Sequence, residues 1–329
     1  MRGQVGVDAS AAWRSARGLS TTASLRRPAP MDRVLARRHP VGVGTLRYGT
    51  CSWSEKAWVG PFYPPGTKPA GYLRHYAKQF DTVETDSTYY ASPPADRVRN
   101  WAEDTPPGFL ISSKLPRDCF LGGDAREMDP ALVLHAPAFE AALARHAQTM
   151  QLLGGKRGPT VVQCPWFQPG YFRDLHDFLG RLDPFLQAAV GLAPLAVEVR
   201  NREFLHDELL AVLRRHRAAL TLVEIRGMPH PADVAERLDV RTADFFYARL
   251  IGDRTAIERK TKTLDRIVVD ASESLGRWAH LLRVHAASAD GFVYANNHFA
   301  GFGPATARAL RALLEGDAPS QAGPALDRS

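Results

Sequence analysis

The sequence is poor in the features that identify several common classes of protein. It has three cysteines in 329 residues, Cys51, Cys119 and Cys164, and no CxxC pair. Neither a disulfide framework nor a zinc ribbon is therefore expected, and a reducing cytoplasmic location is the natural one. No apolar run approaches the roughly eighteen residues that a membrane helix requires, so we expect no membrane partner.

The body of the chain also has almost no net positive charge, because the excess of basic residues lies at the N-terminal end. The net charge is +7. Residues 1–45 contain no Lys and no Glu, and their eight Arg against Asp8 and Asp32 give 8 − 2 = +6. The other 284 residues carry 34 basic and 33 acidic side chains, or +1. Nucleic acid stays an alternative partner, but the charge of the body does not support it.

The N-terminal segment, rich in Arg, Ser and Ala, has two interpretations. It resembles a mitochondrial-type transit peptide in composition, which would change the location to mitochondrial. It also fits a disordered extension, with Met31 as an alternative start to Met1. Because no clear amphipathic face emerges, we favour the extension. We therefore predict a disordered segment at 1–45, a folded domain at 46–316 and a disordered tail at 317–329.

The body alternates strand-like apolar runs with helix-like stretches. Eight strands are predicted, at 46–52, 80–86, 109–115, 159–165, 195–201, 220–225, 245–252 and 291–298. Eight βα units in about 270 residues predict a single (β/α)₈ TIM barrel, an α/β fold. A doubly wound open sheet is the alternative, but neither GxGxxG nor GxxxxGK[ST] follows the first strand.

Nearly every predicted strand ends in polar side chains, which would meet at the carboxyl rim where barrel enzymes keep their sites. These residues are Glu84, Asp86, Lys114, Gln163, Glu198, Arg200, Glu224, Arg249 and Asn296. Glu84 and Asp86 lie in a stretch, 82–90, that looks like a strand, so we expect them on one face about 7 Å apart. In the strand at 195–201, Glu198 shares a face with Ala196 and Arg200, while Leu195, Val197 and Val199 face the helices. Because buried charge must be paired, we expect a hydrogen-bonded network.

Several motifs together resemble a known family. They are "YGTCSWSEKAWVGPFYP", "YLRHYAKQFDTVETDSTYYASPP", "WAEDTPPGFLISSKLP", "LAVEVRN", "YARLIG" and "VYANNH". They are similar to the YecE-like family of unknown function (domain of unknown function, number seventy-two), from about Tyr48 to Leu314. The resemblance implies a TIM barrel and leaves the reaction open.

The chain departs from the family pattern mainly by losing imidazoles. Asp86 stands for the usual Asn, Asn201 for a His and Phe204 for a Trp. Ile251 occupies another position where His is usual, and the His that follows the Lys of the third strand is absent. The residues that match are Glu84, Lys114, Glu198, Arg200, Arg249, Asn296 and Asn297.

We predict an enzyme of the hydrolase or isomerase type that acts on a phosphorylated or polyhydroxylated ligand. Glu84 and Glu198 are the predicted general acid and base, with Lys114 as a third catalytic residue. Arg200 and Arg249 would clamp anionic oxygens. Asp86, Asn296, Asn297 and Trp53 complete the predicted binding residues. A network that only stabilises the barrel is the structural alternative.

Two other functions stay open. A metal-dependent nuclease would need several His on the rim, and only His298 lies plainly there. A single oxygen-ligated Mg²⁺ or Mn²⁺, at Glu84, Asp86 or Glu224, is the one cofactor considered. A non-catalytic binding module would stack a sugar or base on Trp53, Trp58, Phe62 or Tyr63, although we favour packing of that loop over the barrel.

Two smaller patterns carry weaker predictions. Cys51 and Cys164 are interpreted as small buried residues. The glycines of "HFAGFGP" (298–304) indicate either a phosphate site at a helix N-terminus or a tight turn.

Overall fold

The computed structural model describes residues 44–123, 128–192 and 194–316. The segments predicted to be disordered, 1–45 and 317–329, lie outside this range except for Gly44 and Thr45. These two residues are held on the barrel, since Gly44 N donates to Ala286 O at 2.7 Å and Thr45 N to Asp290 Oδ1 at 2.8 Å. The described domain therefore begins slightly before the predicted boundary.

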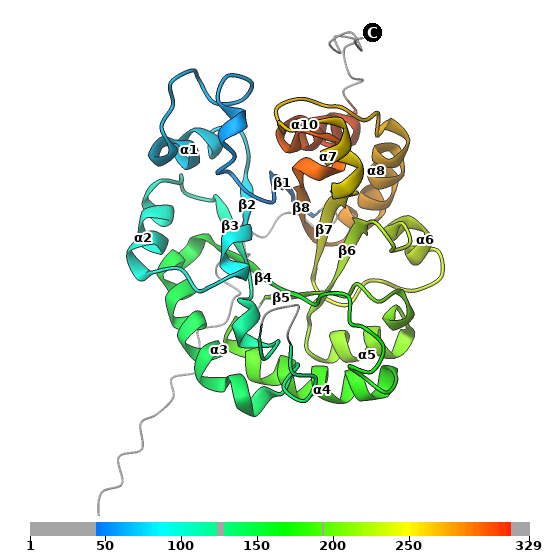
Figure 1. The fold of residues 1–329 in the computed structure, drawn as a ribbon. Helices are drawn as coiled ribbons and strands as arrows, with labels where there is room; N and C mark the ends of the chain where they lie inside the picture. The colour runs from blue at the N-terminus through cyan, green and yellow to red at the C-terminus, as the bar shows by residue number, and fades with distance from the viewer. Residues whose placement is uncertain (1–43, 124–127, 193, 317–329) are drawn as a thin grey trace, which may run out of the picture. The chain divides into compact units, whose positions relative to one another are not determined.

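Eight parallel strands form one sheet that curves around a central axis (Figure 1). The strands are β1 (Leu46–Thr50), β2 (Thr82–Thr85), β3 (Leu110–Lys114), β4 (Arg157–Gln163), β5 (Leu195–Glu198), β6 (Ala219–Ile225), β7 (Phe245–Gly252) and β8 (Asp290–Ala295). Their hydrogen-bonded order, β1-β8-β7-β6-β5-β4-β3-β2, follows the chain around the barrel. The predicted TIM barrel is confirmed, and the open-sheet alternative is wrong.

Helices surround the strands (Figure 1). The α-helices are α1 (Pro69–Tyr76), α2 (Ala95–Glu103), α3 (Ala136–Met150), α4 (Leu175–Ala188), α5 (Asp207–Arg215), α6 (Pro231–Ala235), α7 (Arg254–Lys260), α8 (Ser272–Ala286), α9 (Asn297–Ala300) and α10 (Gly303–Glu315). Short 3₁₀ helices are η2 (Lys56–Trp58), η3 (Asp86–Tyr89), η4 (Arg117–Cys119), η5 (Gln151–Lys156), η6 (Ala189–Leu192) and η7 (Arg202–Phe204). Proline in the first turn opens α1, α3, α6 and α10, where its missing N–H has no helical partner to lose. In the described part of the chain no helix is both long and apolar enough to span a bilayer.

The stretch 82–90 is a strand only in its first half. β2 ends at Thr85, and Asp86 begins η3. Thr88 Oγ1 donates to Thr85 O at 2.8 Å and accepts from Lys114 N at 2.9 Å. The Thr88 side chain takes the place of the next backbone hydrogen bond between β2 and β3, and the chain turns here at the rim. The prediction of a strand through Asp86 is therefore wrong.

The seam between β1 and β2, the two ends of the hydrogen-bonded order, is closed by a side chain. Tyr76 Oη accepts from Thr50 N at 2.7 Å and donates to Thr82 O at 3.2 Å. The backbones approach closely here, because a Cβ on Gly49 would lie 2.1 Å from Thr82 O. Only glycine leaves room for this approach.

Side-chain parity divides the core into an inner and an outer layer. Ala196 belongs to the cluster inside the barrel, together with Val161, Tyr247 and Tyr294. Leu195, Val197 and Val199 belong to the outer cluster that packs against the helices. The predicted division of the fifth strand is confirmed.

The aromatic loop after β1 is part of the core. Trp58, Phe62 and Tyr63 are buried. The Tyr63 ring stacks on Tyr72 of α1 with centroids 4.4 Å apart. This burial supports the preferred interpretation as packing for Phe62 and Tyr63, whereas Trp58 also lines the pocket described below.

Candidate functional site

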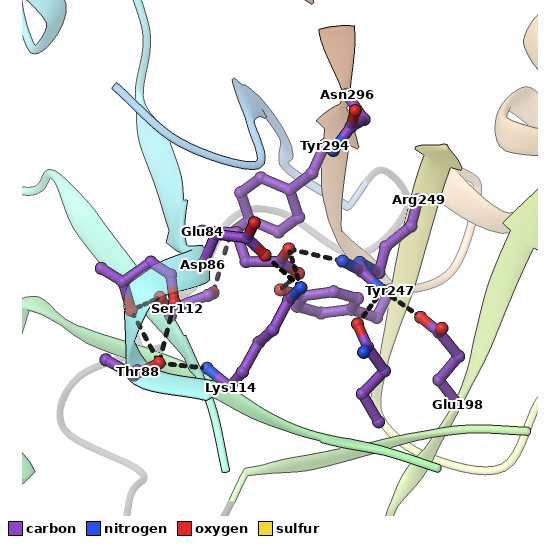
Figure 2. A network of polar contacts seen from close by, with 12 residues as sticks. Glu84, Asp86, Thr88, Ser112, Lys114, Glu198, Tyr247, Arg249, Tyr294 and Asn296 are labelled. Atoms are coloured by element: carbon purple, nitrogen blue, oxygen red, sulfur yellow. Dashed lines mark hydrogen bonds and ion pairs between the residues drawn. The ribbon is translucent and has the colours of Figure 1, made fainter. Parts of the chain in front are cut away.

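A buried ion network forms the floor of the barrel's carboxyl end. Glu84 of β2 and Glu198 of β5 are 0% exposed, and Arg249 of β7 is 1% exposed between them. Arg249 Nη2 donates to Glu84 Oε1 at 2.8 Å, and Nη1 donates to Glu198 Oε2 and, at 2.9 Å, to Gln163 Oε1. Figure 2 shows the guanidinium bridging the two carboxylates. Parity explains its position, since Arg249 follows the inward-facing Tyr247 by two residues.

Further polar groups extend the network toward solvent. Tyr247 Oη donates to Glu84 Oε2 at 2.8 Å. Lys114 lies with its Nζ 3.9 Å from Glu84 Oε1 and donates to Asp86 Oδ1 (Figure 2). Arg200 Nε donates to Glu198 Oε1 at 2.8 Å. The described network holds three carboxylates and three cations and is therefore neutral: Glu84, Asp86, Glu198, Lys114, Arg200 and Arg249.

The network keeps Glu198 and Asp86 ionised. Burial opposes ionisation of Glu198 most strongly, but Arg249 and Arg200 outweigh it and lower the carboxyl pKa to about 2. Burial likewise opposes the charge on Asp86, whose pKa is nevertheless lowered by Lys114. The Arg249 pKa is raised well above its usual value, because Glu198 and Glu84 outweigh its own desolvation. Glu198 therefore has no proton to donate near neutral pH.

Glu224 does not join this network, and its inclusion in the predicted ring is wrong. Its carboxylate Oε2 accepts from Ser274 Oγ and from Trp278 Nε1, both at 2.6 Å. These partners belong to α8, outside the barrel. The reason is parity: Glu224 continues the face of Leu220 and Leu222, which pack in the outer cluster. Burial opposes the charge on Glu224, but His230 first, and then Ser274 and Trp278, lower the pKa of its carboxyl group.

A pocket of about 220 Å³ opens beside the network, between the ends of β1, β2 and β8. Its polar lining includes Ser52, Ser54, Asp86, Asn296, Asn297 and His298. The Asp86 side chain is 43% exposed, so it joins the buried Lys114 to the pocket. Trp53 packs edge-on against Trp101, with ring centroids 5.5 Å apart, and is not among the described residues that line this pocket.

His298 has a defined tautomer in this pocket. Asn296 Oδ1 accepts from His298 N at 2.9 Å, which fixes the orientation of the amide because a backbone N–H can only donate. The same oxygen lies 3.0 Å from His298 Nδ1, so Nδ1 carries the proton. Nε2 is left with its lone pair and lies 3.8 Å from Glu258 Oε1, too far for a hydrogen bond. Burial, and then Arg254, lower the His298 pKa below its usual value, so the ring is neutral at pH 7. The sequence pattern placed His298 on the rim but indicated no catalytic role for it.

The suggested single-metal site has a poor set of ligands. No group of three or more His, Cys, Asp or Glu within 44–123, 128–192 and 194–316 could hold a metal ion. Glu224 lies apart from Glu84 and Asp86. Both oxygens of Glu84 already accept hydrogen bonds, from Arg249 and Tyr247.

The cysteines and the glycine-rich turn have structural explanations. Cys51 and Cys164 are buried, as interpreted from the sequence. Burial raises the Cys51 pKa well above its usual value and that of Cys164 to about 12. At the turn after β8, Asn297 Oδ1 accepts from Gly303 N at 2.9 Å. The side chain of Asn297 therefore already satisfies the first N–H of α10.

Comparisons with known proteins agree with the fold. A DUF72 family protein from Thermotoga maritima superimposes with a TM-score of 0.60 at 20% sequence identity, over 82% of this chain and 99% of that chain. A DUF72 family protein from Enterococcus faecalis gives a TM-score of 0.59 at 19% identity, over 86% of this chain and 100% of that chain. At these identities the likeness concerns the fold alone. A comparison with curated proteins gave no match.

The family pattern described as "Protein of unknown function DUF72" matches residues 47–327. This match confirms the resemblance inferred from the motifs around Trp53, Glu84 and Asn296. Because it spans most of the sequence, the chain belongs to the DUF72 family.

Proposed function

We propose that the protein is an enzyme of the isomerase or hydrolase type that moves a proton on a polyhydroxylated small ligand, with His298 as the general base. The observation that carries this proposal is the fixed tautomer of His298, a residue that lines the polar pocket and whose Nε2 keeps its lone pair, with Glu258 Oε1 3.8 Å away and beyond hydrogen-bond distance. A neutral imidazole with a lowered pKa is suited to accept a proton near neutral pH.

The lining of the rim pocket supports the ligand class. Ser52 and Ser54 offer hydroxyl groups, Asn297 an amide and Asp86 an ionised carboxylate. Such groups donate and accept hydrogen bonds at close spacing, which is what a sugar-like ligand with several hydroxyls requires. Asp86 would orient a ligand hydroxyl beside His298, while Lys114 holds that carboxylate ionised.

The buried floor would act as a positioning device. Glu84, Glu198 and Arg249 are 0–1% exposed, so we assign them no contact with the ligand. They hold Lys114, and through it Asp86, in place. The general acid and base roles first assigned to Glu84 and Glu198 therefore pass, in this proposal, to groups that the ligand can reach.

Proton exchange tests this function whatever the product is. The full chain is incubated in D₂O with a panel of aldoses, ketoses and their phosphates, and deuterium next to the carbonyl is followed by NMR. A parallel panel of glycosides is followed by release of reducing ends. We expect exchange or hydrolysis with at least one compound, and a loss of at least about a hundredfold in His298→Gln.

The matched control is His176→Gln, on an exposed His of α4 whose Nδ1 pairs with Glu208 at 3.1 Å. It should behave as wild type. The rate should rise with pH and reach half its maximum below pH 6.5, since the base must be unprotonated and its pKa is lowered. Ligand binding with neither exchange nor hydrolysis would favour the binding-module alternative. An active His298→Gln variant would refute the assignment of the base.

A further inference from the structure

A second cavity of about 340 Å³, distinct from the rim pocket, lies where the chain leaves β4, β5 and β6. Its lining combines three guanidinium groups with an indole: Trp166, Arg200, Arg202, Glu203, Arg226 and Met228. We propose that this cavity, here called the arginine pocket, binds a small aromatic anion of the nucleoside phosphate class. The inference goes beyond the proposed function and holds whether or not His298 is a base.

The loops that carry Trp166 and Arg202 are tied together by one buried side chain. Asn201 Oδ1 accepts from Phe167 N at 2.8 Å, and its Nδ2 donates to Phe167 O at 3.0 Å. The same Nδ2 donates to Glu203 Oε1 at 2.8 Å. The two bonds to Phe167 fix the segment after β4 against the segment after β5, and the third holds Glu203 within the segment after β5. The indole and the guanidinium therefore line the same cavity in a defined arrangement.

Arg226 is presented to the cavity by a tight turn after β6. Met228 N donates to Ile225 O at 3.1 Å, and Gly227 has φ +88°. A type II turn requires this positive φ at its third position, which glycine adopts without strain. The Arg226 side chain is 68% exposed, and its Nε lies 3.7 Å from Asp253 Oδ2. Such a distant and exposed pair leaves the guanidinium accessible to an anion.

The charge of the lining favours an anionic ligand. Three cations face one carboxylate, Glu203, whose Oε1 is already engaged by Asn201. Arg200 approaches from the buried floor. Among the contacts described, its Nε donates to Glu198 and its two terminal nitrogens make no hydrogen bond. A guanidinium has five N–H donors in a planar fork, so its two terminal nitrogens can still meet phosphate oxygens.

The indole of Trp166 favours a ligand that carries an aromatic ring. Trp166 is 55% exposed, and the other four tryptophans in the described ranges are buried or half-buried. A large exposed ring beside arginines is typical of a platform on which a nucleobase stacks. Met228 adds an adaptable apolar contact. The volume, about 340 Å³, falls at the lower end of small-ligand pockets, which fits a mononucleotide better than a longer chain.

The inference is tested by titrating the full chain with adenosine monophosphate, adenosine and inorganic phosphate, using calorimetry and tryptophan fluorescence. We expect adenosine monophosphate to bind at least about tenfold more tightly than either fragment, with an affinity that falls as salt rises. Trp166→Ala should weaken it at least about fivefold and abolish the fluorescence response. Arg202→Gln combined with Arg226→Gln should reduce its affinity to that of adenosine.

Arg74→Gln is the matched control, because it removes an exposed arginine on α1 that is paired with Asp104. It should leave binding unchanged, and so should His298→Gln, which separates this inference from the proposed function. Absence of binding to wild type at millimolar concentration would overturn the inference. It would also be overturned if inorganic phosphate bound as tightly as adenosine monophosphate, or if Arg74→Gln weakened binding as much as the pocket variants.

Discussion

Replacing Glu84 with Gln keeps the shape of the side chain but removes a charge from the dry floor of the barrel. Glu84 accepts from Arg249 at 2.8 Å and from Tyr247 at 2.8 Å, and it is 0% exposed. In the variant, one oxygen becomes an NH₂ donor that faces one of these two donors. The described network, neutral in the native protein, acquires a net charge of +1.

The size of the effect follows from burial. Removing one partner of a buried ion pair costs about 3–5 kcal/mol, because the remaining charge is left uncompensated. Arg249 still keeps Glu198, and Lys114 keeps Asp86, so we expect the lower end, about 3 kcal/mol. For a domain of this size that lowers the melting temperature by roughly 5 °C. A solvated ion pair would cost far less.

The measurement is denaturant unfolding of wild type, of Glu84→Gln, of Arg249→Met and of the double variant, which together form a double-mutant cycle. Glu315→Gln is the matched control, since Glu315 accepts from Arg311 at the same 2.8 Å but is exposed. It should cost less than about 1 kcal/mol. Combining Glu84→Gln with Arg249→Met restores neutrality, so the double variant should be more stable than the sum of the single effects predicts. A Glu84→Gln variant as stable as Glu315→Gln would refute the reasoning.

Two further predictions concern the seam and the acid limit of the fold. Tyr76→Phe should lower the free energy of unfolding by about 1–3 kcal/mol, because Thr50 N and Thr82 O lose their buried partner. Urea unfolding measures this change. An unchanged midpoint urea concentration would contradict the prediction. Glu198 has a pKa of about 2 against an ordinary 4.5, so the stability it contributes is present above pH 4.5 and is lost as the pH falls toward 2. Glu198→Gln should therefore flatten the dependence of unfolding free energy on pH in that window, and a slope equal to that of wild type would argue against the buried pair.

Much of the fold follows from short-range patterns that the sequence carries. Eight alternating units and the polar residues after each apolar run predicted the barrel and its rim. The period-two alternation of side chains was enough to place Ala196 and Glu198 on the inner face of the strand and Val197 on the outer face. It would also have excluded Glu224, which shares the face of Leu220 and Leu222. The strand through Asp86 was predicted wrongly because the turn depends on Thr88 bonding to Lys114, 26 residues away.

The site itself was decided by tertiary structure. Glu84 and Arg249 are 165 residues apart, and only closure of the barrel and the stagger of its strands bring them to 2.8 Å. Glu84 and Glu198, the predicted general acid and base, lie 0% exposed in the buried floor, and a strand pattern does not tell how deep a side chain lies. The tautomer of His298 depends on one amide orientation. Composition and periodicity therefore determined the scaffold, whereas depth, pairing and accessibility, which set the chemistry, emerged only when distant strands met.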